Sequence, residues 1–245
     1  MPAEPIDLWL VDLAASAPAL EAMERSTPRL SSEDRARAAT FPDTPTRLAA
    51  YAALRLILER TAGPSVRTRP FVRDRSGKPR LEGAGIAFSL AHTEAFALIA
   101  VTRQATVGVD LEQARTITMP QSHKDAIRAA GTGLSRTPLP NGAPDRAFLH
   151  AWARLEAFTK ARGTALQRTL EEAGVRGPSR GSSPADVRAS ARRLANQARL
   201  AVADVALPPG LYGAIAAPSL PPRVRAPLLP ADRAALQSLL GRKDR

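Results

Sequence analysis

The sequence contains no cysteine. Disulfide bonds, thiolate nucleophiles and zinc–thiolate sites are therefore excluded, because each of them needs a cysteine sulfur. Aromatic residues make up only 4% of the 245 residues, which argues against a surface that stacks the bases of a single-stranded nucleic acid. We find no helix-turn-helix, zinc-finger or RNP motif either.

Long apolar segments are missing as well. No apolar run approaches the 18 residues that a membrane-spanning helix needs. The first sixteen residues have no basic region and carry Glu4, Asp7 and Asp12, unlike a secretory signal peptide. We therefore expect a cytoplasmic protein without a membrane partner.

Lysine is rare, and the only lysines are Lys78, Lys124, Lys160 and Lys243. Almost all of the net charge of +12 is arginine. With abundant alanine and proline, this bias can reflect a GC-rich genome. It can equally indicate an anionic partner, such as nucleic acid, a polyphosphate ligand or an acidic protein.

The hydrophobic content of 44% is enough for one large domain or two small lobes. In the first part of the chain, alternation predicts a strand over residues 6–13. Ser31-Ser32 followed by two acidic residues predicts a helix start, and residues 46–61 have helical spacing. Two apolar runs, 86–90 and 96–102, predict a hairpin.

The second part of the chain begins less clearly. Residues 131–145 and 176–184 are rich in Gly, Pro and Ser and predict loops. Residues 147–162 have helical spacing, and residues 185–200 predict a basic amphipathic helix. Two apolar segments split by Pro208-Pro209-Gly210 predict a final hairpin. We expect the last 28 residues, which begin with a Pro-rich stretch, to form a peripheral tail.

One short segment, VGVDLE at residues 107–112, is especially informative. Its apolar and polar residues alternate as in a half-buried strand, so Asp110 and Glu112 share one face. Gly108 beside them leaves room. Two carboxylates on one strand face provide half of a divalent-metal site for phosphate chemistry.

A second segment, WARLEAFTK, can supply the other half. Trp152, Glu156 and Lys160 are four residues apart and share one stripe of a helix. A third carboxylate and a cation beside a metal would make a pyrophosphate site. Each residue also has an ordinary explanation: the two strand carboxylates as solvated residues, Glu156 and Lys160 as a surface ion pair, and Trp152 as core packing.

Together these segments resemble the signature motifs of the 4′-phosphopantetheinyl transferases, in particular the two-lobed monomeric type that activates nonribosomal peptide and polyketide synthases. Further segments match in the family's order: the helix Arg47–Arg55, GKP at residues 77–79, FSLAHT at residues 88–93, and Pro-Gly-Leu-Tyr before AIAA. The resemblance covers roughly residues 5–217. Each half also has a long helix followed by a loop and strands.

The resemblance implies an α+β fold of two pseudo-symmetric α/β lobes, each a small sheet with a long helix, with the active site in the cleft between them. The N-terminal lobe would span residues 1–104 and the C-terminal lobe residues 105–217. Residues 218–245 would form a Pro-rich C-terminal tail. One chain would form a complete site, so we expect a monomer.

The resemblance also implies a reaction of the holo-[acyl-carrier-protein] synthase type. The serine of an acidic acyl or peptidyl carrier protein would attack the β-phosphate of coenzyme A in the presence of Mg²⁺. The phosphopantetheine arm would move to the serine, and 3′,5′-ADP would leave. The net charge of +12 would steer the enzyme to its carrier, and no nucleic acid partner is expected.

The residue roles follow from the matched motifs. Asp110, Glu112 and Glu156 would bind the metal, and the catalytic residues would be Asp110, Glu156 as the base for the serine, and Lys160 at the α-phosphate. The residues expected to bind the coenzyme are Arg47, Arg55, Lys78, Pro79, Ser89, His92 and Lys160, with Arg35 as a further candidate.

Several positions depart from the family pattern. Leu155 stands where the family has a lysine, and Arg154 lies one residue earlier, which is a rotation of about 100° on a helix. Ser89 and Ala91 replace the family's Asn and Ser, and residues 119–133 lack its phenylalanine-rich segment. A catalytically weakened, coenzyme A-binding paralogue with a regulatory role is therefore an alternative. A nucleic-acid-binding protein, suggested by charge alone, ranks below both.

Overall fold

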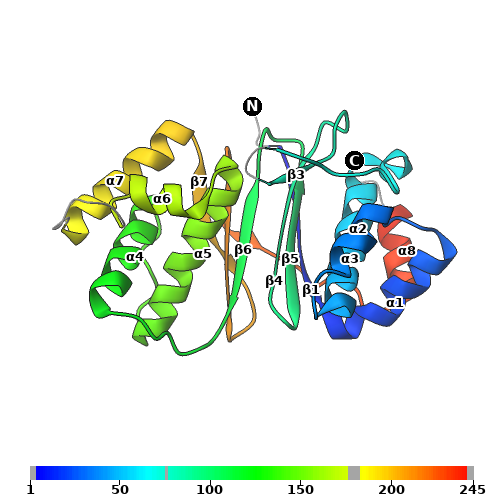
Figure 1. The fold of residues 1–245 in the computed structure, drawn as a ribbon, viewed down its shortest axis with the longest axis horizontal. Coiled ribbons are helices and arrows are strands. Elements are labelled where there is room, and N and C mark those ends of the chain that lie inside the picture. Colours follow the sequence, from blue (N-terminus) through cyan, green and yellow to red (C-terminus); the bar gives the residue numbers. More distant parts are fainter. Residues whose placement is uncertain (1–3, 75–76, 176–182, 242–245) are drawn as a thin grey trace.

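The computed structural model describes residues 4–74, 77–175 and 183–241. Two sheets lie in the middle of the molecule and helices cover both outer sides (Figure 1). Their strands pair antiparallel, except that β9 runs parallel to β7. Within the described residues, no helix is both long enough and apolar enough to cross a bilayer.

The first half of the chain builds one sheet and its helices. Its strands pair in the order β1-β5-β4. A separate hairpin, β2-β3, has strands of two residues each. The predicted strand, capped helix, long helix and hairpin are all confirmed. The elements are β1 (Ile6–Asp12), α1 (Leu13–Ser26), α2 (Ser32–Ala38), α3 (Thr44–Ala62), the 3₁₀ helix η1 (Pro64–Val66), β2 (Val72–Arg73), β3 (Pro79–Arg80), β4 (Ala87–His92) and β5 (Phe96–Thr102).

The second half builds a four-stranded sheet in the order β6-β8-β7-β9. Its first strand pairs with the second strand of the following hairpin, as β1 does with β5 in the first half. The elements are β6 (Gly108–Gln113), α4 (Gln121–Leu134), α5 (Pro144–Arg162), α6 (Leu166–Glu172), α7 (Pro184–Ala198), β7 (Ala201–Ala206), β8 (Leu211–Ala217), β9 (Val224–Arg225) and α8 (Arg233–Gly241).

Alternate residues of the strands face different cores. In β5, Leu98 and Ala100 lie in the cluster between the two sheets, whereas Ile99 and Val101 face helices α1 and α3. A third cluster packs α4, α5 and α7 against the outer face of the second sheet. Because β5 is buried on both faces, its sequence is apolar from Phe96 to Val101 rather than alternating.

Two local signals fixed helix ends as expected. Ser31 Oγ accepts a hydrogen bond from the Asp34 amide, and Asp34 Oδ2 accepts one from the Ser31 amide, so α2 starts with a capping box. Helix α3 ends at Gly63, whose φ of +86° suits glycine. Helix α1 was not predicted, although Asp12 caps it by accepting from the Ala15 amide at 3.0 Å.

The predicted loop over residues 131–145 is partly wrong, because α4 continues to Leu134. Its two glycines lie at helix crossings. A Cβ at Gly131 would overlap Ala151 of α5, and one at Gly133 would overlap the carbonyl of Arg188 of α7. These glycines therefore allow close packing and do not mark a loop. Of the second predicted loop, residues 176–182 lie outside the described part, and α7 begins at Pro184.

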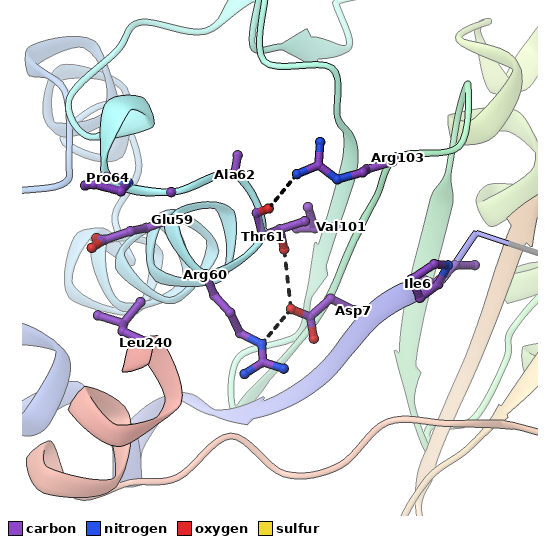
Figure 2. A pocket seen from close by; sticks show the side chains of 12 residues that line it. Ile6, Asp7, Glu59, Arg60, Thr61, Ala62, Pro64, Val101, Arg103 and Leu240 are labelled. Carbon is purple, nitrogen blue, oxygen red and sulfur yellow. Dashed lines mark hydrogen bonds and ion pairs between the residues drawn. The ribbon is translucent and has the colours of Figure 1, made fainter. Parts of the chain in front are cut away.

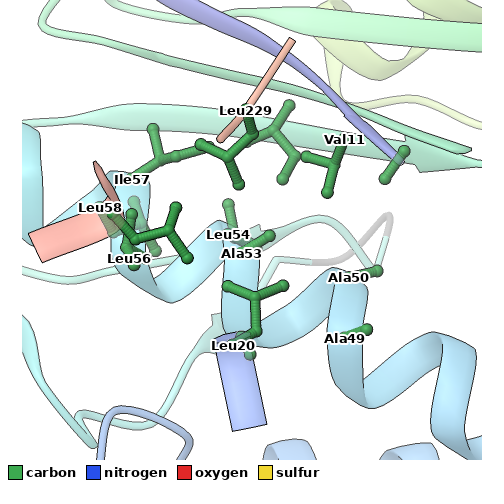
Figure 3. Packing of buried hydrophobic residues seen from close by; sticks show 14 of the residues in the cluster. Val11, Leu20, Ala49, Ala50, Ala53, Leu54, Leu56, Ile57, Leu58 and Leu229 are labelled. Carbon is green, nitrogen blue, oxygen red and sulfur yellow. The ribbon is translucent and has the colours of Figure 1, made fainter. Parts of the chain in front are cut away.

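The expectation of a peripheral C-terminal tail is also wrong. Leu228 forms a parallel bridge with Leu10, and helix α8 packs on α1 and α3. Leu229 and Leu236 are 1% and 0% exposed and belong to the N-terminal core. Figure 3 places Leu229 beside Val11, above the leucines of α3. The segment after β9 thus returns to the first half of the chain and completes its core.

Candidate active site

Strand β6 and helix α5 lie in direct backbone contact at Gly108. A Cβ at this position would overlap the carbonyl oxygen of Ala157 and the backbone nitrogen of Ala161. The glycine of VGVDLE therefore leaves room for the helix backbone, which brings the polar face of β6 to the stripe of α5 that carries Glu156 and Lys160.

The best-defined contact at this crossing joins the two elements. Lys160 Nζ donates to Asp110 Oδ1 at 2.7 Å. Asp110 is 7% exposed, and its Oδ2 is buried with no hydrogen-bond partner among the described residues. Burial raises the pKa of the Asp110 carboxyl, and the charge of Lys160 opposes that shift.

Two further carboxylates lie close enough to interact with this pair. Burial raises the pKa of Glu112 and of Glu156, and the charge of Asp110 raises both further. Glu112 also accepts a hydrogen bond from Arg115 Nη2 at 3.0 Å. The residues predicted from VGVDLE and the α5 stripe are thus neighbours in the fold.

These carboxylates do not form a ready metal cluster. In the part of the chain that the structure describes, no group of three or more His, Asp or Glu residues is arranged to hold an ion. Lys160 binds Asp110 and Arg115 binds Glu112 instead. The donor chemistry still suits a hard divalent cation, since all candidate ligands are carboxylate oxygens and Asp110 Oδ2 is unpartnered. A metal site on Asp110, Glu112 and Glu156 stays a prediction.

A cavity of about 340 Å³ opens beside Lys160. Its walls come from α2, α3, the β2-β3 hairpin and β4 of the first half, and from the end of α5 and residues Gly163 and Thr164 of the second. It therefore lies between the two halves. All the predicted coenzyme-binding residues except Arg55 line it: Arg47, Lys78, Pro79, Ser89, His92 and Lys160.

Comparison with known proteins agrees with this geometry. HetI of Nostoc sp. (strain PCC 7120 / SAG 25.82 / UTEX 2576), a 4′-phosphopantetheinyl transferase, is 30% identical over 175 residues, which are 68% of this chain and 72% of HetI. This chain belongs to the 4′-phosphopantetheinyl transferase family. The resemblance stated from its motifs is confirmed at the level of the family, although no family model matches the chain.

In this transferase, Lys78 is held against the segment that leads into β6. Its Nζ donates to Thr106 Oγ1 at 3.1 Å and to the Val107 carbonyl at 2.9 Å. Burial, helped by the charge of Arg80, lowers the pKa of Lys78 to about 8. The ammonium is therefore a cation at neutral pH whose charge is lost in mildly alkaline solution.

Ser89 and His92 of β4 face the same cavity but already have partners. Ser89 Oγ accepts a hydrogen bond from the Val109 amide at 3.0 Å, which joins β4 to β6 across the two halves. His92 Nδ1 lies 3.1 Å from the Thr93 carbonyl oxygen. Ser89 thus helps to position the strand that carries Asp110.

The structure does not bring Arg55 to the cavity. Arg55 is 2% exposed, binds Asp34 Oδ2 at 2.7 Å, donates to the Arg69 carbonyl at 2.7 Å and stacks on Phe71. Its expected contact with the coenzyme is replaced by a role in holding α2 and α3 together. Arg35 binds Glu24 at 3.3 Å and does not line the cavity either.

Two arginines and a tyrosine of the cavity were not predicted. Arg37, Tyr51 and Arg73 line it together with Arg47, which stacks on Phe41 and binds Asp43 at 2.8 Å. Arg73 Nη1 donates to the Gly77 carbonyl at 2.7 Å. No sequence pattern distinguishes these arginines, since arginine is common along the whole chain.

Leu155, which departs from the family's helix motif, and the neighbouring Arg154 are both buried. Leu155 is fully buried in the core of the second half. Arg154 donates from Nε and Nη2 to both oxygens of Asp204 on β7, each at 2.7 Å. Arg154 therefore points away from the carboxylates of β6 and does not replace the family's lysine.

A larger cavity of about 550 Å³ lies at the C-terminal end of α3 (Figure 2). Its polar groups bind one another: Arg60 and Thr61 donate to Asp7 Oδ2, and Arg103 donates to the Thr61 carbonyl. None of the residues predicted to act in phosphate chemistry lines it. We therefore assign the candidate active site to the smaller, more basic cavity beside Lys160.

Proposed function

We propose that this chain transfers 4′-phosphopantetheine from coenzyme A to a serine of an acyl or peptidyl carrier protein, depends on Mg²⁺ and releases 3′,5′-ADP. Membership of the 4′-phosphopantetheinyl transferase family supports phosphopantetheine transfer in general. The observation that carries the proposal is the pairing of Asp110 with Lys160, a residue that lines a basic cavity between the two halves.

The cavity has the charge that a nucleotide needs. Five basic residues line it: Arg37, Arg47, Arg73, Lys78 and Lys160. Among the described lining residues there is a single carboxylate, Asp34, and it is bound to Arg55. Arginine forks and ammonium groups bind phosphate oxygens by charge-assisted hydrogen bonds. We assign the adenosine and 3′-phosphate end of coenzyme A to this cavity and its pyrophosphate to the neighbourhood of Lys160.

The carboxylates would serve the reaction in two ways. Asp110, Glu112 and Glu156 would hold Mg²⁺, which supplies neutralising charge for the pyrophosphate. Glu156 would accept the proton of the carrier serine, and its raised pKa favours proton uptake. Lys160 would neutralise charge on the leaving 3′,5′-ADP.

We also infer that the halves are the two lobes of the monomeric type, with a boundary near residue 105. The pairing pattern β1-β5-β4 recurs in β6-β8-β7, which supports a pseudo-symmetric pair. The cavity receives residues from both halves of one chain, which supports a complete site in a monomer.

Mass spectrometry tests the function directly. Apo-carrier proteins are incubated with the protein, coenzyme A and Mg²⁺, and we expect a mass gain equal to one phosphopantetheine group. Removal of Mg²⁺ with a chelator should prevent the gain, and its return should restore it. Unmodified apo-carriers from every class tried would contradict the proposal.

A weakened paralogue that binds coenzyme A is the second candidate. The full burial of Leu155 favours it, because a side chain at this position faces the core and not the phosphates. Calorimetry would then find tight binding of coenzyme A, while no carrier would release 3′,5′-ADP. Turnover of any carrier at a rate typical of enzymes rejects this candidate.

The binding of 3′,5′-ADP is expected to weaken as the pH rises from 7 to 9. Lys78, with a pKa of about 8, is mostly charged at the lower pH and mostly neutral at the higher one, and an anion prefers the charged form. The loss should reach up to about tenfold, the change in the charged fraction of Lys78. Calorimetry over this range measures it.

The matched variants are Lys78→Gln and Lys124→Gln. Lys78→Gln should bind 3′,5′-ADP weakly at every pH, and its affinity should not decline between pH 7 and 9. Lys124 binds Asp145 outside the cavity. Lys124→Gln should therefore show the same decline in affinity for 3′,5′-ADP as the wild type. An unaltered pH profile in Lys78→Gln would remove Lys78 from the nucleotide site.

A further inference from the structure

The arginines around the outer edge of the second sheet differ from those of the first half. Many arginines of the first half bind a carboxylate, as Arg29 binds Glu59 and Arg55 binds Asp34. Near β7 and β9, by contrast, a group of arginines has no ion-pair partner among the described residues: Arg136, Arg146, Arg192, Arg199, Arg223 and Arg225.

Two adjoining grooves collect these arginines. The first, of about 1030 Å³, contains Arg136, Arg192 and Arg199 and lies between the ends of α4 and α7 and the start of β7. The second, of about 800 Å³, contains the other three and lies at the end of β7. Thr137, Ala203 and Pro222 line both, so the grooves are continuous along the strand.

Acidic residues are almost missing from these walls. Among the described residues, no Asp or Glu lines the first groove. In the second groove, Asp204 is the one acidic residue within the described part of the chain. It is already bound by Arg154 and lies 3.5 Å from His150. The charge of the combined groove is therefore uncompensated and complementary to an acidic ligand.

The floor of the first groove is a strand with an open edge. β7 pairs with β8 from Ala201 to Val205, but it pairs with β9 only through Val205 and Ala206. Residues 201–204 thus have no second strand partner in the described part of the chain. The wall opposite includes Pro218, Pro221 and Pro222, which have no N–H to donate. An open edge of this kind can accept an added strand.

We propose that this groove binds an extended acidic segment of a partner protein, which adds a strand along residues 201–204 and places carboxylates against Arg136, Arg192 and Arg199. A polypeptide matches both features, because its backbone pairs with the strand edge while its side chains meet the arginines. Nucleic acids and lipid headgroups have no alternating N–H and C=O groups for the edge. The site is separate from the candidate active site, since β8 and β6 lie between β7 and the cavity beside Lys160, and it does not depend on the proposed function.

The test uses the full chain and a fluorescent peptide of alternating glutamate and valine, with anisotropy measured at physiological salt. We expect saturable binding by the wild type. The triple variant Arg136→Gln, Arg192→Gln, Arg199→Gln should bind about tenfold more weakly, as expected for the loss of three exposed ion pairs. The matched control, Arg188→Gln, Arg193→Gln, Arg233→Gln, removes the same charge from exposed positions outside the groove and should change the affinity less than twofold.

Two further probes examine the strand itself. A peptide of alternating glutamate and proline has the same charge but cannot pair fully with the edge, and we expect no saturable binding. Hydrogen exchange at the amides of residues 201–204 should slow when the valine peptide binds.

Several results would overturn the proposal. Equal affinity of the proline peptide or of an oligonucleotide would reduce the groove to a general polyanion surface. Equal losses in the groove and control variants would point to bulk charge. Absence of saturable binding, with wild-type circular dichroism and melting temperature in all variants, would leave no acidic-strand site.

Discussion

Asparagine at position 110 is expected to lower the rate of phosphopantetheine transfer by a factor of about 10³ or more, the scale on which charge stabilisation of a transition state is lost. Asp110→Asn removes a negative charge from the centre of the site and the partner of Lys160 at 2.7 Å. Mass spectrometry of carrier modification over time measures the rate. The matched control is Asp125→Asn, the same change at a residue of α4 outside the cavity.

The fold should tolerate this substitution. Burial raises the pKa of Asp110 above its value in the unfolded chain. The free energy that such a carboxyl contributes to folding is fully present only when the pH is below its unfolded-state pKa. This contribution is lost as the pH rises through the folded-state pKa. A neutral asparagine has no such loss, so the melting temperature of the variant at pH 7 should equal or exceed that of the wild type. Full transfer activity in the folded variant would exclude Asp110 from the site.

Alanine at position 108 should destabilise the protein by about 3 kcal/mol or more. The added methyl group would overlap backbone atoms of Ala157 and Ala161, which cannot rotate away as a side chain can. Either β6 or α5 must shift, and the shift would also separate Asp110 from Lys160. Urea unfolding measures the loss of stability. The transfer assay measures the loss of activity that the separation of Asp110 from Lys160 should cause.

Gly241→Ala provides the control for this prediction. Nothing lies within 4 Å of a Cβ at that position, which is the last residue of α8. We expect a change within about 0.5 kcal/mol there. A comparably small loss at position 108 would mean that α5 and β6 are not in backbone contact, and the assignment of the site to their crossing would fail with it.

Periodicity predicted the elements whose two faces carry different kinds of side chain. Strand β6 alternates because one face lies in the central core and the other carries Asp110 and Glu112. Helix α5 repeats at four residues because its stripe with Glu156 and Lys160 faces the site. The same two patterns identified the three carboxylates and Lys160, whereas Arg47, Lys78, Ser89 and His92 were expected from the family resemblance.

Packing between elements could not be predicted in the same way. Gly131 and Gly133 suggested a loop, because a sequence does not tell a glycine in a turn from one at a helix crossing. Arg55 was expected to contact the coenzyme. Its burial could not be foreseen, because it depends on an ion pair with Asp34, a residue of the capping box of another helix. The segment with Leu229 and Leu236 was expected to be a tail because it begins with a Pro-rich stretch. The residues that bury these leucines come from the start of the chain, so their packing could not be predicted from the local sequence.

The return of the chain after β9 has a consequence for how the protein is made. Leu229 and Leu236 complete a core whose other members come from the first half. During synthesis, these leucines leave the ribosome only after all of β6 to β9. Until then the nascent chain exposes the apolar surface of α1 and α3 that α8 will cover. The half that is translated first is therefore the half whose folding finishes last.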